Sequence, residues 1–437
     1  MRAKDFTVAK VVLVLLIFFS IVPDIGIRFA TFGFTWTAYR FMIAVSVLFV
    51  AISGSITISR RRPSSKWLLF MLIWTLYGFL LLFCGKYTEF HKGFIEWLSL
   101  LNGTVVIYVM SRLLAAKQNR ELADTIIFFL LNGLVAFGFV EILSGWHWSS
   151  SAFCDPNSSI YLYNNRHLAT GLMYNMNDFS AMITCMSPVL LNRRFGIFRL
   201  FTFSGILIIN LINDATTCTL AIFVFLVYYW LLLKREGKSK IIQEKVLLWG
   251  GIIAFAFFAF YERDFFAGQN SFLGAFFRQV NNAKRSSGSL FRRITIYKDA
   301  ISTLGSSGMF GMGPSGFSKY FTLHPSTSKL VNPHGLVFEV LTQYGLMIGI
   351  WFIGLLAWMF IKAQRQYKFS NDVTRDDALK VVAFVIVYFF ASFAPSTFIG
   401  YSYQWLLIAL ACAHLSDSHI VRYNNPLPRN TALFKSV

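Results

Sequence analysis

The chain has 437 residues, of which 56% are hydrophobic, 18% aromatic and only 14% charged, and its mean hydropathy is +0.57. A chain this long and this apolar is not a soluble globular protein, so the composition indicates an integral membrane protein. The formal net charge of +20 could suggest a nucleic-acid partner. The basic residues form short clusters between apolar segments, however, and we therefore expect no nucleic acid.

Apolar segments long enough to cross a hydrocarbon core of about 30 Å recur along the whole chain. They lie near residues 8–22, 36–58, 67–83, 94–114, 125–144, 168–191, 198–212, 215–233, 246–260, 336–361, 379–393 and 398–415. The basic clusters between them are 60–62, 117–120, 193–194, 234–240 and 362–368. Cytoplasmic loops are enriched in Lys and Arg, and about twelve spans with both termini in the cytoplasm place all these clusters inside. The pattern predicts an all-α polytopic membrane protein in which residues 1–437 form a single integral membrane domain.

The longest outer segment joins the ninth and tenth predicted spans, and we expect residues 261–335 to form a cap over the active site. Residues 262–333 include nine Lys or Arg but only three Asp or Glu. An anionic ligand is the simplest reason for so much positive charge outside the cytoplasm, and anionic lipid head groups are the alternative. Within this segment an amphipathic helix is predicted over 290–304. Its apolar face consists of Leu290, Ile294, Tyr297, Ile301 and Leu304.

Arg292 and Arg293 fall in the first turns of this predicted helix, where a guanidinium group can hold a phosphate with two parallel hydrogen bonds. The glycine-rich sequence after the helix, from Gly311 through Gly313 to residue 316, matches GxGxxG. A dinucleotide fingerprint would need a strand before it and a helix after it. We instead interpret Gly311 and Gly313 as a chain reversal that returns the helix towards His334.

His334 precedes the apolar segment 336–361. An imidazole, with an ordinary pKa of about 6.5, is suited to general base catalysis at neutral pH. The alternative is a histidine at the membrane surface that only caps a helix. Glu339 and Gln343 are four residues apart and share one helix face below His334. A carboxylate within the membrane is costly and indicates a cavity or a partner, so these two residues are candidates for the acceptor site or for a structural role.

No metal or other cofactor is expected. The five cysteines have no metal-binding spacing, and the outer loops contain no Asp-x-Asp pair.

Three blocks of the sequence share spacings with one family. The first is Arg166-His167-Leu168-Ala169-Thr170-Gly171 with Asn175 and Asn177. The second consists of Arg293, Tyr297, Ala300, Gly311 and Gly313, while a spacing of sixteen residues instead selects Arg292 and Gly308. The third is His334 with Gly345 eleven positions later. Together the blocks, over roughly residues 160–360, resemble the O-antigen ligase and polymerase superfamily.

The resemblance implies a fold like that of GT-C glycosyltransferases and a location in the bacterial plasma (inner) membrane, with the active site on the extracytoplasmic face. It implies a metal-independent enzyme that transfers glycan from undecaprenyl diphosphate to a sugar hydroxyl with inversion. His334 would be the catalytic base, and Arg293, Arg166 and Arg292 would bind the donor diphosphate.

We expect a polymerase of lipid-linked repeat units of a surface polysaccharide, such as O-antigen, capsule or exopolysaccharide. Its partners would be the undecaprenyl-diphosphate-linked oligosaccharide, membrane lipid and a chain-length regulator. An O-antigen ligase, which moves the finished glycan to another acceptor, is the first alternative. Gln343, where many ligases carry Glu, leaves this choice open. A flippase or exporter of lipid-linked oligosaccharide is the alternative of another class.

Overall fold

The computed structural model describes residues 3–23, 28–31, 34–52, 63–158, 161, 166–235, 289–324, 333–369, 372–395 and 397–415. For 3–7, 28–31, 34–36, 233–235, 289–294 and 372–373 this description covers the backbone but not the side chains. The predicted ninth span, 246–260, lies outside the described residues, as do 261–288 and 325–332 of the predicted cap.

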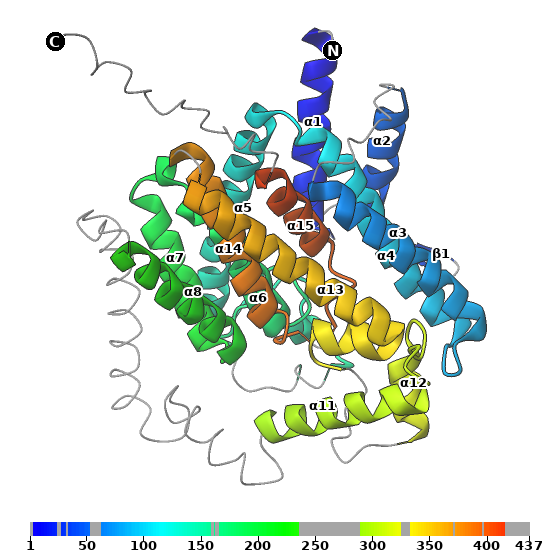
Figure 1. Ribbon diagram of the computed structural model, residues 1–437. Helices are drawn as coiled ribbons and strands as arrows, with labels where there is room; N and C mark the ends of the chain where they lie inside the picture. The colour runs from blue at the N-terminus through cyan, green and yellow to red at the C-terminus, as the bar shows by residue number, and fades with distance from the viewer. Residues whose placement is uncertain are drawn as a thin grey trace, which may run out of the picture.

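The described part of the chain folds into a bundle of α-helices (Figure 1). The helices before the segment 236–288, which lies outside the described residues, are α1 (Ala3–Ile21), α2 (Ala38–Ile52), α3 (Pro63–Cys84), α4 (Phe90–Leu113), α5 (Lys117–Ser144), α6 (Met176–Met186), α7 (Phe198–Ile212) and α8 (Thr216–Arg235). Those after it are α11 (Ser289–Ser306), α12 (Gly316–Leu323), α13 (Leu336–Phe369), α14 (Asp372–Ala391) and α15 (Ser402–His414). Short 3-10 helices cover Ala152–Cys154, Ser187–Leu191 and Arg193–Phe195. The strands β1 (Arg28–Thr31) and β2 (Phe34–Thr37) form an antiparallel hairpin.

Four helices, α3, α4, α5 and α13, are long and apolar enough to cross a membrane. Shorter apolar stretches occur at Val8–Ile21, Ala38–Ile52, Phe198–Ile212 and Thr216–Leu232. The chain is thus a helical membrane protein, as its composition predicts.

Some of the predicted spans differ from the helices observed. The segment 168–191 is not one helix, because residues 169–171 bind other elements through their backbone and helix α6 starts only at Met176. The segment 398–415 shortens to the thirteen residues of α15, because the backbone at 398–399 binds the carboxylate of Glu339.

Close packing in the middle of the bundle requires glycine at one helix crossing. Helix α4 packs closely against α3 and α15. At Gly103 of α4, a Cβ atom would lie 2.7 Å from the indole of Trp405 in α15. Helices in membranes commonly approach one another through small residues in this way.

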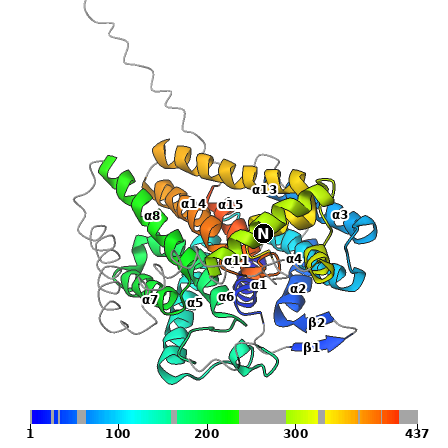
Figure 2. The ribbon, with the colours of Figure 1, turned by 90° about the horizontal axis from the view of Figure 1, so that it is seen from below.

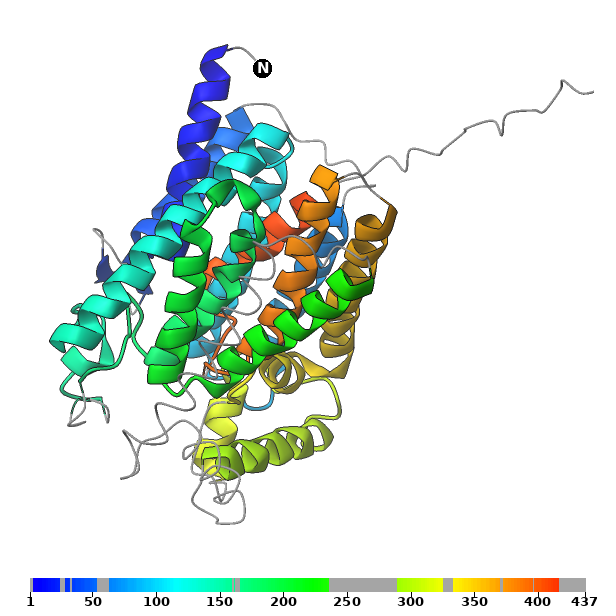
Figure 3. The ribbon, with the colours of Figure 1, turned by 90° about the vertical axis from the view of Figure 1, so that its left-hand side faces the viewer.

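Helices α11 and α12 lie across one end of the bundle, the end opposite to the one where α1 begins (Figures 1 and 3). Figure 2 views this end, which we call the α11 end. The two helices share a small apolar cluster, formed by Ile296, Ala300, Phe317 and Phe321. The predicted amphipathic helix is therefore present, but one residue of its predicted apolar face is wrong. Ile301 is 58% exposed, since Ile296 and Ala300 make the contacts with α12.

Candidate active site

Helix α13 is broken near its start. Gly345 has a φ of 81° and a ψ of 175°, so residues 336–344 and 346–369 form two helical segments. The first segment is set at an angle to the second in Figure 1. Residues 336–344 therefore run across the α11 end, while 346–369 carry the long membrane-spanning part of the helix.

The turn at 309–313 closes this break with backbone hydrogen bonds. The N–H groups of Met312 and Gly313 donate to the carbonyls of Thr342 and Gln343, both at 2.9 Å, and the N–H of Leu346 donates to the carbonyl of Met309 at 3.0 Å. A break in a helix leaves such groups without partners, and inside a membrane each one costs several kcal/mol, on the order of 3. The glycine turn is preceded by helix α11, not by a strand as a dinucleotide site would require.

Substituting Gly345 by alanine should destabilise this joint. The new Cβ would lie 2.5 Å from the carbonyl oxygen of Met309, and a positive φ alone costs a non-glycine residue about 1 to 3 kcal/mol. We expect Gly345→Ala to lower the free energy of unfolding by at least that amount, measured by thermal or denaturant unfolding in detergent. Gly354→Ala is the matched control, because nothing lies within 4 Å of its Cβ position. Equal stability of the two variants would contradict this account of the break.

His334 lies at the junction of α11, α13 and α14. Its backbone has a φ of 47°, a left-handed conformation that is uncommon for a residue other than glycine. The hydroxyl of Tyr297 in α11 donates to the His334 carbonyl at 2.8 Å. The N–H of Leu336, which starts α13, donates to the carbonyl of Ser392 at 3.2 Å. The segment with the candidate base is therefore held on two sides, and the ring of Tyr297 stacks on Phe338, with 4.2 Å between ring centroids.

The backbone of Arg292 and Arg293 lies in the first turns of α11, and both side chains lie outside the described residues. The register of the helix is nevertheless informative. Arg293 comes four residues before Tyr297 and so shares its helix face. Arg292 comes four residues before Ile296, which is fully buried in the contact with α12.

Glu339 and Gln343 are both buried, with 2% and 4% of their surface exposed. The Glu339 carboxylate accepts hydrogen bonds from the N–H groups of Phe398 at 2.7 Å and Ile399 at 3.3 Å. The amide oxygen of Gln343 accepts from the N–H of Ser315 at 2.9 Å. Each therefore anchors a neighbouring loop. For Glu339, the backbone at 398–399 is the partner that a buried carboxylate requires.

Glu96 of α4 also belongs to this junction, although it is not among the predicted site residues. Its carboxylate accepts from the same Ser315 N–H, at 2.8 Å. The signal was present in the sequence, since Glu96 is the one acidic residue within the predicted span 94–114. Glu96 and Gln343 together fix the start of α12 to α4 and α13.

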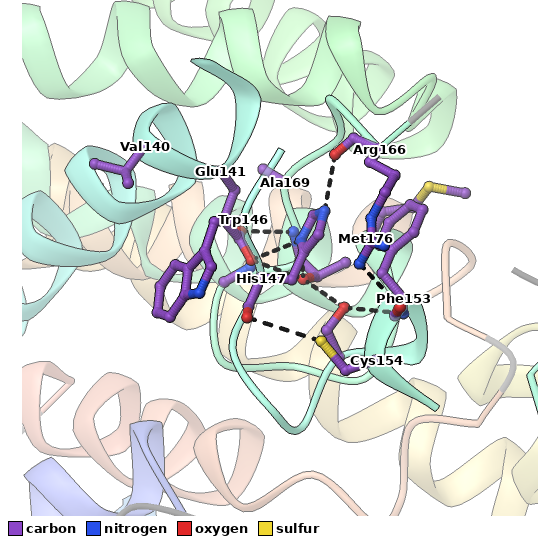
Figure 4. A network of polar contacts seen from close by, with 12 residues as sticks. Val140, Glu141, Trp146, His147, Phe153, Cys154, Arg166, Ala169 and Met176 are labelled. Carbon is purple, nitrogen blue, oxygen red and sulfur yellow. Dashed lines mark hydrogen bonds and ion pairs between the residues drawn. The ribbon is translucent and has the colours of Figure 1, made fainter. Parts of the chain in front are cut away.

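Arg166 lies in the loop between α5 and α6, within a network of polar contacts (Figure 4). Its guanidinium donates to the carbonyl of Phe153 at 3.1 Å, and its own carbonyl accepts from Nε2 of His147 at 2.8 Å. Nδ1 of His147 lies 3.0 Å from the carboxylate of Glu141. Among the described residues, the hydrogen bonds of Arg166 are with this loop.

The pair of His147 and Glu141 lies at the buried centre of this network. His147 is only 4% exposed and Glu141 is fully buried. The other oxygen of Glu141 accepts from the N–H groups of Thr170 at 2.8 Å and Gly171 at 2.5 Å. Because the Arg166 carbonyl can only accept, Nε2 of His147 carries a proton and the pair with Glu141 holds the loop onto α5.

A cavity of about 320 Å³ opens between the end of α1, the start of α2, the middle of α4, the start of α15 and the loop after α5. Five aromatic side chains line it: Tyr39, Tyr174, Tyr401, Tyr403 and Trp405. Its polar lining includes Arg40, Ser99, Asn102, Ser150 and Ser402. Gly400, which lines the cavity, directly follows the residues 398–399 that bind Glu339. The cavity therefore adjoins the His334 junction through this loop. We call this cavity the aromatic chamber.

At the opposite end, Asp124, Asp377 and His414 form the group among the described residues that could hold a metal ion, with ligand atoms within 4.8 Å of one another. The ammonium group of Lys380 lies 2.6 Å from the Asp124 carboxylate and 2.7 Å from that of Asp377. Positive charge is therefore already supplied between the two carboxylates. We call these four residues the Asp124 clasp. It joins α5, α14 and α15.

The arrangement thus combines a histidine at a broken helix, a helix that carries two arginines, and an aromatic chamber beside them. No protein-family model matches this chain, and no curated protein is significantly similar to it in sequence.

Proposed function

We propose that this protein is a glycosyltransferase of the bacterial plasma membrane that polymerises lipid-linked repeat units of a surface polysaccharide. The observation that carries the proposal is the hydrogen bond from Tyr297 to the carbonyl of His334. It joins the helix that carries Arg292 and Arg293 to the segment that carries the candidate base. Tyr297 and His334 are 37 residues apart in the sequence. Their contact brings the two segments together, as a two-substrate reaction centre at this end of the bundle requires.

In the proposed reaction the acceptor hydroxyl attacks the anomeric carbon of the donor sugar. The bond from that carbon to the diphosphate oxygen breaks, and a new glycosidic bond forms with inversion. His334 takes the proton of the attacking hydroxyl, and the electron pair of the broken bond stays on undecaprenyl diphosphate. Fixed cations stabilise the charge that develops on the leaving diphosphate.

Helix register favours Arg293 as the main donor-binding residue. A rise of about 6 Å, slightly more than one helical turn, separates its position from that of Tyr297 on the same face. Arg292 shares a face with Ile296, which packs against α12. In this proposal Arg166 has a supporting role, since its guanidinium binds the loop that contributes Ser150 and Tyr174 to the aromatic chamber.

The aromatic chamber is the proposed acceptor site. Sugar rings stack on tyrosine and tryptophan faces and exchange hydrogen bonds with hydroxyl, amide and guanidinium groups, and the chamber offers both kinds of surface. Glu339 and Gln343 act here through the loops that they anchor. A polymerase and a ligase share this chemistry and differ in the acceptor.

The proposal is tested by replacing single cations and measuring glycan length. We expect Arg293→Gln to reduce the addition of repeat units by about 100-fold to 1,000-fold, the usual effect of removing one group that stabilises developing charge. Arg292→Gln should have a smaller effect, and Lys319→Gln on α12 serves as the control for loss of a positive charge. Products are resolved by electrophoresis of lipid-linked glycans.

Single repeat units left on the acceptor would identify a polymerase, whereas long chains left on the carrier lipid would identify a ligase. Normal glycan length in Arg293→Gln, or an equal loss in Lys319→Gln, would refute the proposed donor site.

A further inference from the structure

A second pocket, of about 570 Å³, lies between α8, the last turns of α13 and the first turns of α14. It is far along α13 from the His334 junction, at the end of the bundle that carries the Asp124 clasp. Three cations line it: Arg365, Lys368 and Arg375. Its described lining contains no Asp or Glu, in contrast to the neighbouring pocket around the clasp, which mixes both charges.

The apolar part of the pocket consists of Leu231, Leu232 and Ile361. Just before Ile361 in α13, the ring of Trp358 lies 4.4 Å from the ammonium group of Lys66 and 5.5 Å from that of Lys362. Tryptophan with flanking lysines is typical of the boundary between hydrocarbon and head groups. The pocket therefore starts at that boundary, with its apolar lining next to the bilayer and its cations in the last turns of the helix.

Polar contacts inside the pocket hold its walls in place. The side-chain amide of Gln364 donates to the hydroxyl of Tyr228 at 3.2 Å, which joins α13 to α8. The guanidinium of Arg375 lies 4.4 Å from the ring centroid of Tyr367, which orients its planar group. An oriented guanidinium matches the geometry of a phosphate better than a free ammonium group does.

We propose that this pocket binds the head group of an anionic phospholipid. The phosphodiester is held by Arg365, Lys368 and Arg375, and an acyl chain lies along Leu231 and Ile361. Basic pockets between membrane helices at the membrane surface recognise anionic lipids by this combination of charge and apolar surface. The site is independent of the proposed glycosyl transfer, because it shares no lining residue with the aromatic chamber.

The test measures lipid binding to the purified full-length protein by native mass spectrometry, with phosphatidylglycerol and phosphatidylcholine of the same acyl chains. Each basic residue near a membrane surface contributes about 1 kcal/mol, so Arg365→Gln/Lys368→Gln/Arg375→Gln should bind phosphatidylglycerol on the order of 100-fold more weakly. Binding of phosphatidylcholine should not change. A second variant, Arg365→Lys/Arg375→Lys, keeps the charge and should lose about tenfold, because it lacks the planar groups.

The control variant Lys86→Gln/Lys92→Gln/Lys319→Gln removes the same charge at the α11 end and should bind phosphatidylglycerol as the unmodified protein does. Equal weakening in the control would show attraction by overall charge and would overturn the proposal. Unchanged binding in the triple variant would overturn it as well. Displacement of the lipid by inorganic phosphate at the same concentration would show a site for the free anion instead of a lipid.

Discussion

Replacing His334 by asparagine should abolish the lengthening of the glycan, with a rate at least 100-fold below that of the unmodified protein. A positioned general base contributes about 10² to 10⁴ to such a rate, and asparagine cannot take the proton of the acceptor hydroxyl. Asparagine is preferable to alanine here, because the φ of 47° at this position is a conformation that asparagine tolerates. The carbonyl that accepts from Tyr297 also remains.

The matched control is His324→Asn, at the exposed end of α12 in the same part of the chain. We expect glycans of normal length from this variant. Both proteins should be present in the membrane in equal amounts and should unfold at the same temperature, which separates loss of chemistry from loss of folding. Full-length glycans from His334→Asn would mean that this imidazole only shapes the start of α13.

Asp124→Asn should destabilise the fold by about 3 to 5 kcal/mol, the usual result of removing one partner from a buried ion pair. Asp124 is 2% exposed, and its two oxygens contact Lys380 at 2.6 Å and His414 at 3.0 Å. Its replacement leaves the ammonium group of Lys380, itself only 6% exposed, with one carboxylate in place of two. Because the clasp joins three helices, the whole bundle should unfold more easily.

This prediction is checked by denaturant unfolding in detergent micelles, with Glu121→Gln as the control in the same helix. Glu121 pairs with Lys117 at 3.7 Å on the surface, and both side chains are more than half exposed. Surface pairs of this kind contribute about 0 to 1 kcal/mol, so the control should remain close to the unmodified protein. Equal stability of the two variants would show that the clasp does not hold the helices together.

Much of the fold follows from local patterns in the sequence. Long apolar segments predict α3, α4, α5 and α13, and the period of apolar residues predicts α11. The sequence predicts these features because a membrane helix must satisfy its own backbone hydrogen bonds. Local patterns did not predict the positions where a helix changes to irregular backbone. The start of α6 at Met176 depends on Glu141, a carboxylate about thirty residues away in the sequence.

The candidate site was likewise predictable only where its residues follow a local spacing pattern. The spacing of His334 and the glycines marks one region of interest, and Tyr297 was part of that pattern. The roles of His147 and Glu96 depend on contacts between segments that are distant in the sequence, and periodicity does not report such contacts. Arg166 was selected through the family resemblance, and its guanidinium binds the Phe153 carbonyl in its own loop.

The joint between the turn at 309–313 and the break in α13 is made by main-chain atoms. Such a joint places few demands on the identity of side chains, so related chains can diverge at almost every position around it. The demand that persists is for residues without a Cβ at 311 and 345, where backbone approaches backbone within 2.5 to 2.7 Å of the added atom. Distant relatives should therefore be recognisable by the number of residues between these glycines and a preceding helix that begins with arginines, as α11 does, even where overall similarity has been lost.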